Sequence, residues 1–111
     1  MALALQTSSY HEHQIHASHA VTLGHYVDCI NALDERMQWG EIVSKAYEAG
    51  LRKEQLCEEL SCSWSTVTRW MAGQTAPGPF ARAAIKAKLI EMVLRMKDDA
   101  TERAASLKHV A

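Results

Sequence analysis

Residues 50–73 read GLRKEQLCEELSCSWSTVTRWMAG and contain two short amphipathic segments on either side of a tight turn. Apolar side chains recur at helical spacing from about residue 53 to residue 59, and residues 61–63 form the turn. Ser63 is a favourable N-cap for a second helix, and Gly73 suits the left-handed conformation that often ends one. Two short helices joined by a three-residue turn predict a helix-turn-helix, whose second helix enters the major groove of DNA.

The apolar positions of this stretch are those that must hold two such helices at a fixed angle. They are Leu56, Leu60, Cys62, Val67 and Trp70, with Cys57 as a further small inner residue. The order Gly-Leu, first helix, small turn, serine-anchored second helix, tryptophan and glycine resembles the XRE-type helix-turn-helix of phage repressors and Cro. The resemblance covers about residues 40–96. It implies a compact all-α domain of four or five helices that is often dimeric on two-fold symmetric operators.

Two positions depart from the pattern of that family. Cys57 stands where the family usually has an inward alanine, and a cysteine fits there because it is a small buried hydrophobe. Ser61 stands where the turn usually begins with glycine. We therefore expect either a positive φ at Ser61, at some energetic cost, or a slightly different turn.

The second helix is expected to present a small polar surface to DNA. Winding residues 63–72 at about 100° per residue places Ser65, Thr68, Arg69 and Ala72 opposite the inner face. Arg69 can reach a guanine edge or a phosphate, and the alternative for the serine and the threonine is an ordinary solvated face. The resemblance implies that the following residues contact the groove: Ser63, Trp64, Ser65, Thr68 and Arg69. Trp64 lies at the boundary of the two faces, where it can contact DNA or pack against the domain.

The start of the first helix carries two cations, Arg52 and Lys53. The helix macrodipole disfavours cations there by a few tenths of a kcal/mol each, whereas a bound phosphate would favour them. Lys53 also matches a phosphate-contact position implied by the resemblance. The alternative is that Glu54 offsets the cost and no ligand binds.

The net charge is −1, but the acidic and basic residues are distributed unevenly along the chain. Residues 1–50 carry a net charge of −4 and residues 51–97 a net charge of +4, and no acidic residue occurs between Glu59 and Glu91. Arg82 and Lys86 lie in that gap, so we expect them to bind phosphate as well. With Lys53 and Arg69, two subunits would make about eight phosphate contacts and give a log–log salt slope near −7. An ordinary patchy surface is the alternative.

Three further helices and two flexible ends complete the expected architecture. Helices are predicted over about residues 20–37, 39–49 and 80–97, with Gly50 ending the second of them. The side chains expected on the buried faces of the first two are Leu23, Tyr26, Ile30, Leu33 and Met37, then Ile42, Val43, Ala46 and Tyr47. Residues 1–19 are predicted to be a flexible histidine-rich arm, and residues 98–111 a frayed tail.

The helix over residues 80–97 has two apolar stripes about half a turn apart. Ile85, Leu89, Met92 and Met96 line the first stripe; Ala83, Ala87, Ile90 and Leu94 line the second. A surface helix needs only one apolar face, so the second stripe predicts a homodimer, with this helix or the helix over residues 20–37 at the interface. The alternative is that the helix over residues 20–37 covers it within a monomer.

Composition and motifs exclude several other classes. Three cysteines, no signal-peptide pattern and no long apolar run favour a reduced cytoplasmic protein. The clustered histidines could chelate a transition metal, but no CxxC or HExxH pattern supplies a closed site, so neither a metal nor another cofactor is expected. They are His11, His13, His16, His19 and His25. No nucleophile elbow, glycine-rich phosphate loop or paired-carboxylate signature indicates an enzyme.

The sequence therefore predicts a cytoplasmic transcriptional regulator, most simply a repressor that binds an inverted repeat in double-stranded DNA as a homodimer. The alternative is a protein-interaction module on a helix-turn-helix scaffold, such as an anti-activator or an antitoxin-like adaptor. On either interpretation the acidic N-terminal half could dock a protein partner, such as polymerase. The two alternatives differ in the salt dependence of DNA binding.

Overall fold

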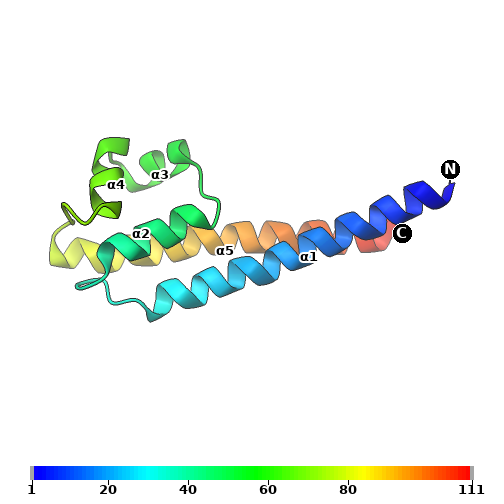
Figure 1. Ribbon diagram of the computed structural model, residues 1–111, viewed down its shortest axis with the longest axis horizontal. Helices are drawn as coiled ribbons and strands as arrows, with labels where there is room; N and C mark the ends of the chain where they lie inside the picture. Colours follow the sequence, from blue (N-terminus) through cyan, green and yellow to red (C-terminus); the bar gives the residue numbers. More distant parts are fainter. Residues whose placement is uncertain (1, 111) are drawn as a thin grey trace.

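The computed structural model describes the backbone of residues 2–110 and the side chains of residues 12–106. The described chain is all-helical, which confirms the predicted fold class. Its helices are α1 (Ala2–Ala32), α2 (Trp39–Glu48), α3 (Lys53–Leu60), α4 (Trp64–Met71) and α5 (Pro79–Val110). The two long helices, α1 and α5, run antiparallel side by side and form what we call the stalk, and α2, α3 and α4 gather against one end of it (Figure 1).

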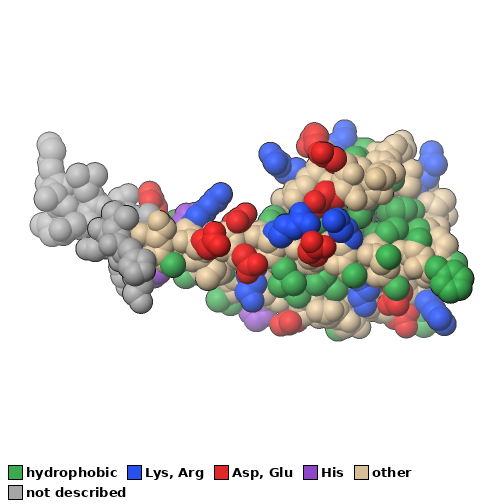
Figure 2. All heavy atoms as spheres, turned by 180° about the vertical axis from the view of Figure 1, so that it is seen from behind, with side chains coloured by type: hydrophobic (Ala, Val, Ile, Leu, Met, Phe, Trp, Pro, Cys, Tyr) green, Lys and Arg blue, Asp and Glu red, His purple; other side chains and the backbone are tan. Residues whose placement is uncertain are grey.

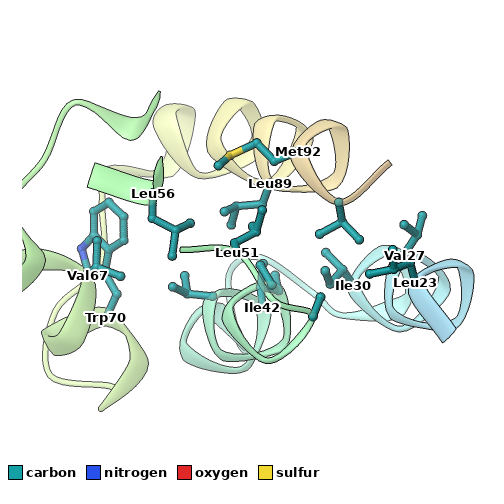
Figure 3. Close-up of a cluster of buried hydrophobic side chains, with 14 of the residues drawn as sticks. Leu23, Val27, Ile30, Ile42, Leu51, Leu56, Val67, Trp70, Leu89 and Met92 are labelled. Carbon is teal, nitrogen blue, oxygen red and sulfur yellow. The ribbon is translucent and has the colours of Figure 1, made fainter. Parts of the chain in front are cut away.

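A continuous hydrophobic core joins the stalk to the three short helices (Figure 3). Each helix contributes at least one side chain that is completely buried: Leu23 and Ile30 from α1, Ile42 and Val43 from α2, Leu56 from α3, Val67 from α4, and Leu89, Met92 and Val93 from α5. Since burial of apolar surface is the main favourable term in folding, this core fixes the position of α4 relative to the stalk.

A tight turn joins α3 to α4. Ser61 follows the last residue of α3 with φ 52° and ψ 45°, so the expected positive φ is confirmed. Ser63 is the N-cap of α4, and its hydroxyl oxygen accepts a hydrogen bond from the Thr66 N–H at 3.2 Å. Gly73 has φ +74° just beyond α4, as predicted. Local residue choices therefore set both ends of α4.

The left-handed Ser61 makes a testable stability prediction. Replacing Ser61 by glycine is expected to raise the free energy of unfolding by about 0.5–1 kcal/mol, because glycine adopts a positive φ without the steric cost that a Cβ brings. Ser65→Gly, in the same motif but inside α4, is expected to lower it by about 0.5 kcal/mol. Urea denaturation measures both, and a destabilised Ser61→Gly variant would contradict the backbone conformation described here.

The first helix ends earlier than the sequence pattern predicted. α1 stops at Ala32, and the Asp34 carboxylate accepts hydrogen bonds from the N–H groups of Arg36 at 2.7 Å and Met37 at 3.2 Å. An aspartate that bonds the backbone ahead of it competes with helix continuation. The expected burial of Met37 is therefore wrong, since 86% of its surface is exposed.

The expected arm and tail instead form part of the stalk. Residues 12–19 lie within α1 and residues 98–106 within α5, where Ala100 and Ala104 are buried. His13 Nδ1 donates a hydrogen bond to the Ala104 carbonyl oxygen at 2.6 Å. The two segments pack on each other although they lie at opposite ends of the chain. The side chains of residues 1–11 and 107–111, including His11, lie outside the part that the structure describes.

Candidate nucleic-acid interface

The exposed face of α4 carries the side chains that the winding argument predicted. Ser65, Arg69 and Ala72 are exposed, whereas Val67 and Trp70 on the opposite face are 0% and 6% exposed. The inner face therefore anchors the helix, and the outer face is open to a ligand.

Not every hydroxyl on α4 is available to a partner. The Ser63 hydroxyl caps the helix and also lies 3.0 Å from the Thr66 hydroxyl. The half-buried Thr68 donates its hydroxyl hydrogen to the Ser65 carbonyl oxygen at 2.9 Å. Among the described residues nothing bonds to the Ser65 hydroxyl or to the Arg69 guanidinium, so these two donors on the outer face of α4 are open to solvent.

Trp64 packs against the domain. Its ring centroid lies 5.3 Å from that of Tyr47 in α2, and the Lys53 ammonium lies 5.6 Å above its centroid. The ring is half-buried, which shows the packing role that the sequence left open for it. Tyr47 is 40% exposed instead of buried, because its ring lies at this edge of the domain and not in the core. The contact with Lys53 places the start of α3 beside the start of α4.

The N-terminus of α3 combines two exposed cations with a helix end that no side chain caps. Arg52 is the N-cap residue, in an extended conformation and without a side-chain hydrogen bond to the helix. Arg52, Lys53 and Glu54 are all exposed, and no ion pair joins them in the described structure. The free N–H groups and both cations therefore favour an anion at this position.

Arg82 and Lys86 do not join this cluster. Arg82 donates Nε–H to the Pro77 carbonyl oxygen at 2.8 Å and a second bond to the Arg36 carbonyl oxygen at 3.4 Å. The structure therefore occupies the Arg82 guanidinium with the two loops that lead into and out of the short helices. This disagrees with its expected role as a free phosphate contact.

Lys86 is engaged even more fully, at the C-terminal end of α1. Its ammonium lies 2.6 Å from the Leu33 carbonyl oxygen, 3.4 Å from that of Asn31 and 3.5 Å from a Glu35 carboxylate oxygen. Carbonyls at the end of a helix lack internal donors and attract a cation. The charge pattern of the sequence could not reveal these acceptors, which lie more than 50 residues away along the chain.

A contact that the sequence analysis missed ties α3 to the stalk. Arg95 on α5 bonds the Glu59 carboxylate at 2.7 Å and the Glu91 carboxylate at 2.8 Å. The hydrogen bond from Arg95, with help from Lys88, lowers the pKa of Glu91. The i,i+4 spacing of Glu91 and Arg95 was visible in the sequence, whereas the pairing with Glu59 depends on the tertiary fold.

The cysteines of the motif are packing residues. Cys57 and Cys62 are half-buried, and burial, followed by the proximity of Cys57, raises the pKa of the Cys62 thiol. A raised pKa keeps the thiol protonated and makes it a poor nucleophile or metal ligand. Within residues 12–106, no group of three histidine, cysteine, aspartate or glutamate side chains is placed to hold a metal ion.

Comparison with known proteins gives no assignment for this chain. No protein-family model matches it, and neither the curated proteins nor the solved structures include a significant match. In the described part of the chain no helix has the length and apolar character needed to cross a membrane.

Proposed function

We propose that this chain is a sequence-specific DNA-binding transcriptional regulator, a repressor that places α4 in the major groove of double-stranded DNA. It would occupy an inverted repeat as a homodimer and exclude other proteins from the promoter. The observation that carries the proposal is the pair of unbonded donors on the outer face of α4, Ser65 and Arg69, opposite a fully anchored inner face.

The start of α3 supplies the second half of the interface. Because Lys53 stacks on Trp64, the cationic end of α3 lies beside the N-terminus of α4. A helix inserted in the groove would bring this end close to the flanking phosphates. We assign Arg52 and Lys53 to phosphate contacts and Arg69 to a base edge. Arg82 and Lys86 are left out because backbone carbonyls already hold them.

The proposal is tested by fluorescence anisotropy on the DNA upstream of the chain's own gene and on a scrambled duplex. Two phosphate-contacting cations in each of two subunits make four phosphate contacts, so we expect a log–log salt slope of about −3.6 between about 50 and 200 mM salt. This value replaces the slope near −7 that four cations per subunit would give. Preference for the native duplex is the result expected of a specific regulator.

The Arg69→Ala variant tests whether α4 itself contacts the bases. Loss of a base contact is expected to weaken binding to the native duplex about tenfold to a hundredfold and to reduce its advantage over the scrambled one. Arg103→Ala is the matched control, because Arg103 is an exposed arginine on α5 in the part of the stalk that pairs with residues 12–19. An unchanged affinity in Arg69→Ala would remove α4 from the interface.

A protein-interaction module is the second candidate, and one observation favours it. A shallow groove of about 480 Å³ runs between α2 and the end of α4, and it includes the exposed Met37 together with Glu41, Lys45 and Glu48. Lys45 pairs with Glu48 at 3.3 Å, which leaves Glu41 as a carboxylate beside Met37 that no other described residue pairs with. An apolar side chain next to a carboxylate suits a protein better than DNA, because the carboxylate repels phosphate. Absence of salt-sensitive binding to either duplex would favour this candidate over the DNA-binding regulator.

A further inference from the structure

One side of the stalk has apolar side chains that no other described element covers. We call it the stalk face and define it by Val21, Gly24 and Asp28 on α1 and by Ile90, Leu94 and Lys97 on α5. Val21 is 62% exposed and Leu94 is 38% exposed. A groove of about 360 Å³ runs between the two helices there, with Val21, Gly24, Asp28 and Lys97 in its walls. Hydrophobic side chains reach the surface of the stalk between charged ones (Figure 2).

The stalk face includes part of the second apolar stripe of α5. The first stripe enters the core, where Leu89 and Met92 are completely buried. In the second stripe Ala83, Ala87 and Leu94 are exposed and only Ile90 is half-buried. α1 therefore packs beside the second stripe and does not cover it, so the monomeric alternative considered for this helix does not hold over the described residues.

We propose that a second copy of this chain covers the stalk face, so that two stalks pack face to face as a four-helix bundle. Gly24 and the exposed alanines of α5 lack long side chains, which allows helices to approach closely. Val21, Ile90 and Leu94 supply the apolar surface that leaves water on association. The arrangement of charge on the face identifies the occupant as this same chain.

Asp28 and Lys97 are the charged residues of the stalk face, and neither the Asp28 carboxylate nor the Lys97 ammonium forms an ion pair or hydrogen bond with another described residue. The end of the Lys97 side chain lies beside Gly24, because a Cβ built on Gly24 would be 3.7 Å from both Cε and Nζ of Lys97. Asp28 lies one helical turn further along α1, which is about 6 Å and within the reach of a lysine. Asp28 and Lys97 of one subunit therefore lie close to each other along the stalk axis, but they do not pair with each other.

The direction of the two-fold axis follows from these two charges. If the two-fold axis of the dimer runs parallel to the stalk, α5 of one subunit packs on α1 of the other. Each Lys97 then lies opposite Asp28 of the partner subunit. If the two-fold axis instead runs across the stalk, α1 packs on α1 of the partner subunit and α5 packs on α5. This brings each Asp28 and each Lys97 toward its equivalent in the partner subunit, and such pairs of like charge are unfavourable. The parallel axis makes the stalk face complementary to itself, as a two-fold interface must be.

The parallel axis has a consequence that rests on the proposed function. It places both helix-turn-helix units at the same end of the bundle, because α2, α3 and α4 pack at one end of each stalk (Figure 1). Met92 faces these helices and lies about half a turn around α5 from Leu94, so the two units lie on opposite outer sides of the bundle. This arrangement relates the two recognition helices by one two-fold axis at the same end of the bundle, as an inverted repeat requires.

Sedimentation equilibrium of the full chain without DNA tests the interface. We expect the wild type to be a dimer and Leu94→Glu to be a monomer with unchanged helical circular dichroism. Met37→Glu is the matched control, because Met37 is 86% exposed but lies off the stalk face, and it should remain dimeric. A monomeric wild type, or a Leu94→Glu variant that stays dimeric, would overturn the proposal.

A charge exchange tests the axis and does not depend on burying a new charge. Lys97→Asp and Asp28→Lys are each expected to weaken the dimer about tenfold, by loss of two exposed ion pairs and gain of repulsion, and the double variant should restore it. A double variant no tighter than the single ones would overturn the parallel axis. These outcomes are separable from those of the proposed function: a dimer without DNA binding contradicts the regulator alone, and DNA binding by a monomer contradicts the stalk interface alone.

Discussion

Trp70→Ala is expected to lower the free energy of unfolding by about 3–5 kcal/mol. The Trp70 side chain is 6% exposed and meets Trp39 edge to face, with ring centroids 5.7 Å apart and planes at 75°. Removing the ring leaves a cavity between α4 and α2 and also breaks the aromatic pair. A loss of this size is a large part of the stability of a small domain, so α4 would lose its fixed position.

Trp64→Ala is the matched control, because Trp64 lies on the same helix but is only half-buried. Its loss is expected to cost about 1–2 kcal/mol, from the area that it buries against Tyr47 and Lys53. Urea denaturation followed by circular dichroism measures both variants. Equal losses at the two positions would contradict the assignment of Trp70 to the core and Trp64 to the edge.

Gly40→Ala is expected to destabilise the fold by about 3 kcal/mol, although alanine is normally favoured over glycine in a helix by about 1 kcal/mol. The reversed sign has a steric cause. A Cβ at Gly40 would lie 2.8 Å from the Trp70 carbonyl oxygen and 3.3 Å from that of Met71. These atoms belong to the backbone of α4 and its end, so α2 and α4 would have to move apart.

Ser44→Ala provides the control within the same helix. Ser44 lies one turn further along α2, is half-buried and forms no hydrogen bond through its hydroxyl to another described residue, so its replacement should change the free energy of unfolding by less than about 0.5 kcal/mol. Thermal and urea unfolding of both variants give the comparison. A Gly40→Ala variant as stable as Ser44→Ala would show that α2 and α4 do not approach each other as closely as described.

The sequence by itself determined the features that depend on neighbours within about one helical turn. The cap at Ser63, the positive φ at Gly73, and the inward position of Val67 and Trp70 all follow from local backbone chemistry and helical spacing. For that reason the two helices of the motif and the outward face of α4 could be predicted before the fold was known. The positive φ at Ser61 was one of two alternatives, since a slightly different turn was also open.

The tertiary structure alone decided which cations are free and how far the long helices extend. Lys86 meets carbonyls 53 and 55 residues away along the chain, and His13 meets one 91 residues away. No local pattern encodes such pairs, because the acceptors are backbone groups that every residue carries. The same limit explains the expected arm and tail: the segments that contain residues 12–19 and 98–106 each look weakly ordered alone, and their packing on each other makes both part of the stalk.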